Sequence, residues 1–249
     1  YLVWIDGAAR VLVDAGSGVA TNFGRSGALI EDLDAIVLAH LHGDHSADLP
    51  ALVKASYFGG REKDLPVYGP TANRLMPATT VYLDRLLGLD GAFRYLHEYI
   101  DEDIRSDYKL KPVDINASGR KAVSVFKNER LELRAIPVTH GPLPALAWRV
   151  DVGSKSISFS GDMSGNRQTF RKLALNADVL IAHNAIPESA AGGVTRLHMT
   201  PSTIGGIAEF AKPKHLLLSH RMRRSLGREQ QTLSAIRASF PGKVSFADD

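Results

Sequence analysis

Apolar and polar residues alternate along the chain in short blocks, and these blocks predict many strands. Residues 2–5 and 11–13 are apolar and flank Asp6-Gly7, a dipeptide typical of a tight turn, which predicts a β-hairpin. The run at 35–39 is continuously apolar, which predicts a strand buried on both faces. The other predicted strands are 65–68, 123–126, 131–137, 146–152, 156–159, 179–182, 215–219 and 244–247.

Apolar residues at helical spacing predict helices between the strands. Thr200-Pro201 combines a capping residue with a proline at the first helical position, and predicts a helix that runs to Ala211. Residues 71–116 are rich in aromatic residues and predict a helical insert, either a lid or substrate wall or a layer that only packs on the sheets. The other predicted helices are 27–34, 47–57, 167–175 and 228–239. Hairpins followed by strands that alternate with helices predict the α/β fold class.

Four polar side chains of metal-ligand type follow the strand at 35–39. His40 and His42 project to the same side of an extended segment and can bind one ion. Gly43 allows a sharp turn, so that Asp44 and His45 begin the next helix and can face a second ion. One histidine at a strand end is usually a capping or surface residue, whereas four such side chains within six residues predict a metal site.

Three further candidate ligands, His140, Asp162 and His220, each follow a later apolar strand. Since α/β folds build their sites from polar groups at strand ends, we expect these residues to meet the first cluster. Convergence of ligands so far apart in the sequence would make residues 1–249 a single domain.

Composition narrows the chemistry of the site. The 249 residues contain no cysteine, which leaves only nitrogen and oxygen donors and favours Zn(II), with Mn(II) or Fe as alternatives. The net charge of +3 is too small to predict a nucleic-acid partner, and no apolar run is long enough to span a bilayer. The prediction is therefore a soluble protein of unassigned compartment: periplasmic or secreted if a signal peptide once preceded Tyr1, and otherwise cytoplasmic.

The sequence His40-Leu41-His42-Gly43-Asp44-His45 resembles the HxHxDH motif of the metallo-β-lactamase-fold hydrolases. The resemblance implies a four-layer αβ/βα sandwich with two divalent ions. His40, His42 and His140 would serve one ion, Asp44, His45 and His220 the other, and Asp162 would bridge them.

Each ion would keep an open position for water, which is the arrangement of a catalytic site. Two adjacent cations lower the pKa of a shared water, so that a bridging hydroxide can attack an ester, with Asp44 orienting that nucleophile. Asp14, in the loop Asp14-Ala15-Gly16-Ser17-Gly18, would orient the loop or a ligand histidine.

The last third of the chain is similar to the tRNase Z branch of this family. His198, in Leu197-His198-Met199-Thr200, would then act as a general acid or oxyanion stabiliser. Two departures argue against tRNA as the substrate. Asn184 stands where the branch has a glutamate, and only 21 residues separate His140 from Asp162, too few for the arm that grips tRNA. Arylsulfatases and cyclic-phosphate diesterases resemble this compact form more closely.

Basic residues follow the last candidate ligand. Arg221 and Arg223 would hold a phosphate or sulfate, whereas a solvated basic turn is the alternative for this segment. His97, His183 and His215 are interpreted as structural or surface residues.

These features predict a dinuclear hydrolase that acts on a small ester, either a phosphodiester or an aryl sulfate. The alternatives are a lactone or thioester hydrolase, a mononuclear iron oxidoreductase that resembles persulfide dioxygenases, and a metal-holding protein without turnover. The expected partner is a small-molecule substrate and not nucleic acid, and a homodimer is compatible with the sequence.

Overall fold

The structure is a computed structural model that describes residues 1–247. The chain forms two compact units, here called the N-terminal unit (Tyr1–Ile115) and the C-terminal unit (Asn116–Asp249). Each consists of a β-sheet with helices, so the predicted α/β class is confirmed. Among the described residues, none of the helices combines the length and the apolarity that a bilayer span requires.

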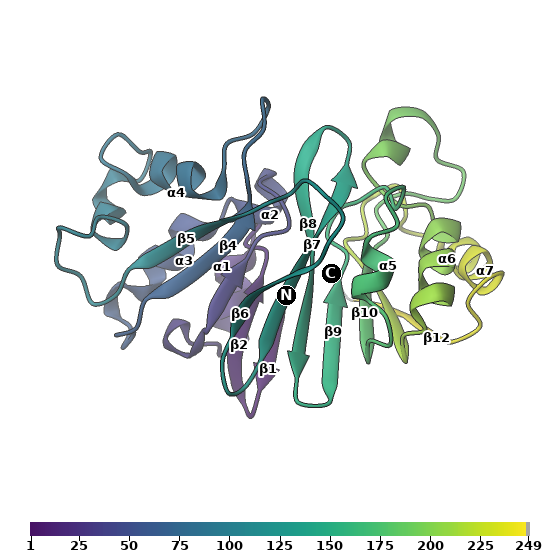
Figure 1. Cartoon of the computed structure of the whole chain (residues 1–249), viewed down its shortest axis with the longest axis horizontal. Coiled ribbons are helices and arrows are strands. Elements are labelled where there is room, and N and C mark those ends of the chain that lie inside the picture. Colours follow the sequence, from purple (N-terminus) through teal and green to yellow (C-terminus); the bar gives the residue numbers. More distant parts are fainter. Residues whose placement is uncertain (248–249) are drawn as a thin grey trace. The chain divides into compact units, whose positions relative to one another are not determined.

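The N-terminal unit contains a five-stranded sheet in the order β1-β2-β3-β4-β5 (Figure 1). Its strands are β1 (Leu2–Ile5), β2 (Ala8–Val13), β3 (Ala35–Val37), β4 (Leu65–Pro70) and β5 (Leu110–Ile115). The first two strands are antiparallel, and the others run parallel to β2. Asp6 and Gly7 both have positive φ, 51° and 81°, as the two-residue hairpin turn requires.

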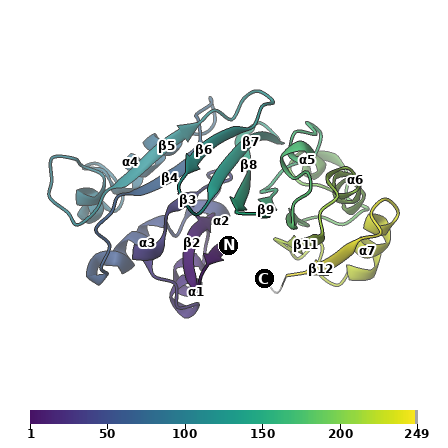
Figure 2. The same ribbon diagram turned by 60° about the horizontal axis from the view of Figure 1, so that its bottom comes forward.

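The helices of this unit are short. They are α1 (Val19–Arg25), η1 (Ile30–Asp32), α2 (Gly43–Ser46), α3 (Leu49–Ala55), η2 (Ser56–Phe58), α4 (Thr79–Leu87) and η3 (Arg94–Tyr99). Leu12, Ile36 and Leu38 of the sheet region pack with Leu52 of α3 and Leu83 of α4 in one buried core. Figure 2 shows α1 and α3 side by side near β2 and β3.

The predicted helical insert at 71–116 is only partly correct. Residues 79–99 do contain α4 and η3, but residues 110–115 form β5, which pairs in parallel with β4. Pro112 lies within β5, where a proline is tolerated because the strand is at the edge of the sheet. The helices predicted at 27–34 and 167–175 are also shorter, at Ile30–Asp32 and Phe170–Leu173.

The C-terminal unit contains a seven-stranded sheet in the order β12-β11-β10-β9-β8-β7-β6. Its strands are β6 (Val123–Lys127), β7 (Glu132–His140), β8 (Leu143–Val152), β9 (Lys155–Phe159), β10 (Val179–His183), β11 (His215–Ser219) and β12 (Lys243–Phe246). Strands β6 to β9 form antiparallel hairpins, and β9 to β12 are parallel. The order places the carboxyl ends of β9, β10 and β11 next to one another.

The described part of this unit also contains the helical segments α5 (Phe170–Leu173), η4 (Gly192–Arg196), α6 (Pro201–Ala211) and α7 (Glu229–Arg237). The predicted start of α6 is confirmed, because the Thr200 side chain accepts a hydrogen bond from the Thr203 amide and Pro201 is the first helical residue. A Cβ on Gly205 would lie 3.0 Å from the Ile236 Cα, so this glycine allows α6 and α7 to approach closely. Both views show α6 between α5 and α7 (Figures 1 and 2).

Candidate metal centre

The first group of candidate ligands lies where β3 gives way to α2 in the N-terminal unit. His40 and His42 belong to the segment that joins β3 to α2, and Asp44 and His45 to the first turn of α2. Ligand atoms of His40, Asp44 and His45 lie within 4.8 Å of one another, and His40 Nε2 is 3.0 Å from His42 Nδ1. The rings of His40 and His45 are buried, whereas the Asp44 side chain is 54% exposed. These four side chains form the first half-site.

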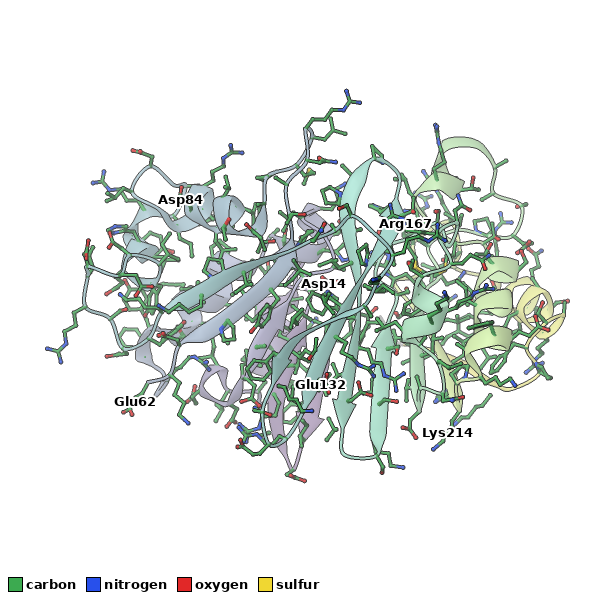
Figure 3. The ribbon with its side chains drawn as sticks, viewed as in Figure 1. Asp14, Glu62, Asp84, Glu132, Arg167 and Lys214 are labelled. Carbon is green, nitrogen blue, oxygen red and sulfur yellow. The ribbon has the colours of Figure 1, made fainter. Side chains whose placement is uncertain are left out.

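Asp14, which is labelled in Figure 3, holds the His45 ring of this half-site in place. Its Oδ2 lies 2.7 Å from His45 Nδ1, and its Oδ1 accepts a hydrogen bond of 2.7 Å from the Ala39 amide. A carboxylate on Nδ1 fixes the ring and leaves Nε2 as the nitrogen that can bind a metal, which is how outer partners orient ligand histidines. Asp14 is therefore a residue that orients His45.

The loop that carries Asp14 is also attached to α2 through its backbone. The Ala15 amide donates to the His45 carbonyl at 2.7 Å, and the Asp48 amide donates to the Ala15 carbonyl at 2.8 Å. A Cβ on Gly16 would lie 1.7 Å from the Asp44 carbonyl oxygen, so only glycine fits at that position. The loop thus fixes the start of α2, and with it the backbone of Asp44 and His45.

The second half-site, in the C-terminal unit, surrounds Asp162. This residue follows β9 and is 3% exposed. Its Oδ1 lies 2.8 Å from His183 Nδ1 and 3.8 Å from His220 Nε2, while its Oδ2 lies 3.6 Å from His198 Nδ1. The rings of His183 and His220 are stacked with centroids 4.6 Å apart. One buried carboxylate therefore brings together histidines from the ends of β10 and β11 and from the segment before α6.

His140 belongs to the same unit and is held by a backbone group instead of a carboxylate. It ends β7, is buried, and its Nδ1 donates to the Leu197 carbonyl at 2.8 Å, which leaves Nε2 for a metal. Its ring centroid lies 5.6 Å from that of His198. His140 and His198 therefore lie at the same end of this sheet.

His183 is interpreted from the sequence as a structural or a surface residue, and its burial excludes the surface alternative. It is 2% exposed, and it contacts both Asp162 and the ring of His220. A signal for it exists in the sequence, because His183 ends an apolar run in the same way as His140 and His220. His97 and His215 have other partners: His97 is 2.8 Å from Asp101, and His215 is 2.7 Å from the Ser245 hydroxyl.

The two arginines predicted to bind substrate differ in their surroundings. The Arg221 guanidinium pairs with Glu229 and lies 4.6 Å from the centroid of the Phe246 ring. It would have to leave Glu229 in order to hold a substrate. Arg223 is exposed. Asn184 is buried and donates to the Ile186 carbonyl at 3.3 Å, so the carboxylate beside His198 is that of Asp162.

The donor set fits divalent metal ions. All the candidate ligands are imidazoles or carboxylates, and two of the histidines have Nδ1 held by an oxygen, so that Nε2 is the available donor. A buried carboxylate surrounded by histidines, such as Asp162, is costly to ionise unless positive charge lies close to it. Bound cations would supply that charge.

Two mixed sheets with histidines and aspartates at their strand ends define the class of metallo-β-lactamase-fold hydrolases. The sequence profile of the Beta-lactamase superfamily domain matches residues 9–221, and the chain belongs to this superfamily of metal-dependent hydrolases. The matched region includes residues of both units. The predicted family is therefore confirmed, while the single domain over 1–249 stays a prediction.

Individual relatives agree with this assignment. The Ribonuclease Z of Listeria monocytogenes serotype 4a (strain HCC23) is 30% identical over 244 residues, which cover 84% of this chain and 77% of that protein. The crystal structure of human tRNase Z, short form, covers 100% of this chain and 88% of its own, with TM-score 0.73 and 19% identity. A diphosphatase from the PhnP family covers 100% of this chain and 80% of its own, with TM-score 0.62 and 21% identity.

Proposed function

We propose that the chain hydrolyses phosphodiesters of small molecules, with the histidines and aspartates of both half-sites holding two divalent metal ions. The ligands would be His40, His42, Asp44, His45, His140, Asp162 and His220. Zn(II) is the preferred metal, with Mn(II) or Fe as alternatives, because the donors are imidazole and carboxylate. The observation that carries the proposal is the buried Asp162 carboxylate with three histidines within 3.8 Å of it.

Bound divalent ions would make water nucleophilic near neutral pH and neutralise charge on a phosphate. The residues of this chain would supply position and protons. Asp14 holds the His45 ring and the Leu197 carbonyl holds that of His140, so both Nε2 atoms have a fixed direction. Asp44 is half exposed at the start of α2 and would orient the attacking water.

His198 would give a proton to the leaving group. Its Nδ1 is 3.6 Å from Asp162 Oδ2, and its ring lies beside that of His140. We expect His198→Ala to lower turnover at least about tenfold for an alkyl phosphodiester. The loss should be smaller for a p-nitrophenyl diester, whose leaving group needs no proton, and equal losses would contradict the role.

Phosphate chemistry is also supported by the relatives, since one is named a ribonuclease and another a diphosphatase. RNA is therefore the alternative substrate. The connections between His140 and Asp162 favour a small substrate: β8 begins at Leu143, directly after the Gly141-Pro142 turn, and β9 follows β8 after Gly153-Ser154. This stretch consists of two strands and tight turns and contains no arm to grip an RNA.

The test is a substrate comparison with protein stripped of metal and then reloaded with Zn(II) or Mn(II). We expect metal-dependent hydrolysis of bis(p-nitrophenyl) phosphate that exceeds hydrolysis of p-nitrophenyl sulfate, a homoserine lactone and an RNA with an extended 3′ end. Activity confined to the lactone, the sulfate or the RNA would assign a different substrate class. One iron per chain together with oxygen consumption would replace hydrolysis by redox chemistry.

A further inference from the structure

A cavity of about 590 Å³ lies in the C-terminal unit beside two of the candidate site histidines. Gly141 and Pro142 line it directly after His140, and Arg196 and Leu197 line it directly before His198. Asn166, from the loop after β9, completes its wall. A cavity of this volume can hold a group the size of a nucleotide.

Hydrogen bonds join the three segments that form the cavity. The Gly141 amide donates to the Arg196 carbonyl at 2.8 Å, and the Ser164 amide donates to the Thr139 carbonyl at 2.8 Å. His140 Nδ1 donates to the Leu197 carbonyl, also at 2.8 Å. Gly141 has φ of 56°, and a Cβ there would lie 2.7 Å from Leu197 Cδ2. The cavity is thus formed by the same contacts that orient His140.

Arg196 is the charged residue among those that line the cavity. Its side chain is exposed, and among residues 1–247 no carboxylate pairs with its guanidinium. Asn166 adds an amide from the loop after β9. The adjacent Arg167, labelled in Figure 3, accepts a hydrogen bond of 3.0 Å through its carbonyl from Arg120 Nη2, so a further guanidinium lies near this loop.

The whole unit carries excess positive charge. Of the 30 Lys and Arg residues of the chain, 19 lie in residues 116–249, whereas only 10 of the 27 Asp and Glu residues do. A concave surface with an unpaired guanidinium in a basic unit attracts anions, and the planar guanidinium can hold two phosphate oxygens at once.

We propose that this cavity is an anion subsite, in which Arg196 binds a phosphate of the substrate other than the one that is cleaved. The inference rests on the proposed function and specifies the substrate class as a phosphodiester with a second phosphate on the neighbouring nucleoside. That second phosphate can belong to a dinucleotide with a terminal phosphate or to the next link of an RNA strand.

The kinetic test compares the dinucleotides ApA and pApA, which differ in one terminal phosphate. We expect the wild-type chain, loaded with metal, to have a KM for pApA about tenfold below that for ApA. Arg196→Ala should remove this preference, and Arg196→Lys should restore part of it. Arg237→Ala, which removes the same charge from the exposed face of α7, should keep the full preference. An unchanged preference in Arg196→Ala, together with unchanged affinity for the RNA of the second assay below, would overturn the proposal.

The source of the second phosphate is decided by a ten-nucleotide RNA in the same assay. Loss of affinity in Arg196→Ala for both pApA and the RNA would assign the subsite to any neighbouring phosphate. Loss for the RNA alone would assign it to an internal phosphate of a strand, and loss for neither would exclude an anion subsite.

A binding measurement separates failure of this inference from failure of the proposed function. Inorganic phosphate is titrated by calorimetry at low salt into protein that has been stripped of metal. We expect Arg196→Ala to weaken phosphate binding about tenfold or more relative to the wild type and to Arg237→Ala. If no phosphodiester is hydrolysed, the proposed function fails, and this titration still tests the subsite. Equal phosphate binding by all three proteins would overturn the subsite alone.

Discussion

The N-terminal and C-terminal units hold their histidines by different means. In the N-terminal unit a side chain does this, because Asp14 reaches from its loop to His45 Nδ1. In the C-terminal unit a backbone carbonyl holds His140, and Asp162, itself a candidate ligand, contacts three further histidines. The first half-site can therefore be loosened without removing a ligand, whereas the second depends on one carboxylate.

The units also differ in charge. The N-terminal unit has 11 Lys and Arg against 17 Asp and Glu, and the C-terminal unit has 19 against 10, so the net charge of +3 conceals two opposite signs. An anionic substrate would be attracted by the C-terminal unit in particular. The small net charge of the whole chain thus conceals the positive charge of the C-terminal unit, which bears on substrate choice.

The largest effect is expected from Asp162→Asn, which keeps the shape of the side chain and removes its charge. Loss of a residue that only orients a metal ligand typically costs 10–100-fold in activity or metal affinity, and Asp162 is itself a proposed ligand. Since Asp162 contacts three histidines, we expect a loss of more than about 100-fold in turnover of bis(p-nitrophenyl) phosphate. The control is Asp178→Asn, which changes a carboxylate of the same unit that pairs with Lys214. Similar losses of turnover in both variants would show that activity does not depend on the Asp162 carboxylate in particular.

Gly16→Ala should break the first half-site through the backbone. The added Cβ meets the Asp44 carbonyl oxygen at 1.7 Å, and backbone cannot move aside as a flexible side chain would. We expect the free energy of unfolding to fall by about 3 kcal/mol in urea denaturation. Gly24→Ala is the matched control, because no atom lies within 4 Å of its added Cβ and it lies in α1. That variant should be more stable than the wild type by about 0.5 kcal/mol.

Asp14→Asn should loosen the first half-site without unfolding it. Asparagine tolerates the positive φ of 61° at this position and can still accept the hydrogen bond from Ala39, but it loses the charge beside His45 Nδ1. We expect a 10–100-fold weaker metal affinity, measured by competition with a chromophoric chelator, and an unchanged unfolding midpoint for the metal-free protein. Unaltered metal affinity would mean that the Asp14–His45 contact serves only the fold.

The smallest effect concerns pH. Burial lowers the pKa of His215, and the charge of Lys243 lowers it further, so the folded chain binds fewer protons than the unfolded chain below about pH 6.5. The contribution of His215 to the free energy of unfolding is therefore fully present above pH 6.5 and declines as the pH falls.

In the N-terminal unit the pKa of Asp101 is lowered by a hydrogen bond from the Asp103 amide and by His97. Its contribution is present above pH 3.8 and is lost as the pH falls through the lower pKa of the folded state.

Urea denaturation over a pH series tests these two pH ranges, in which the free energy of unfolding is expected to decline. His215→Gln should flatten the decline that begins near pH 6.5, and Asp101→Asn should flatten only the decline below pH 3.8. A decline near pH 6.5 that persists in His215→Gln would assign it to another group.

Much of the fold was predictable because its signals are local. The turn at Asp6-Gly7, the cap at Thr200-Pro201, and the β6–β7 and β8–β9 pairings each depend on residues that are close in the sequence. The strand β5 was not predicted, because its segment has weak alternation and contains Pro112, and its state is decided by pairing with β4 forty residues away. The lid role of residues 71–116 stays a prediction.

The sequence by itself determined which residues follow a strand and which metal-binding atoms they offer. A short apolar run marks the strand, and the type of the next residue gives the nitrogen or oxygen ligand atom. Only the tertiary structure decided which of these ends become neighbours. His183 contacts Asp162 and His220 because β10 lies between β9 and β11, and adjacent parallel strands are only about 4.8 Å apart. In the same way, the cavity beside Arg196 depends on segments distant in the sequence. Strand order is set by the packing of the whole sheet, which local periodicity does not encode.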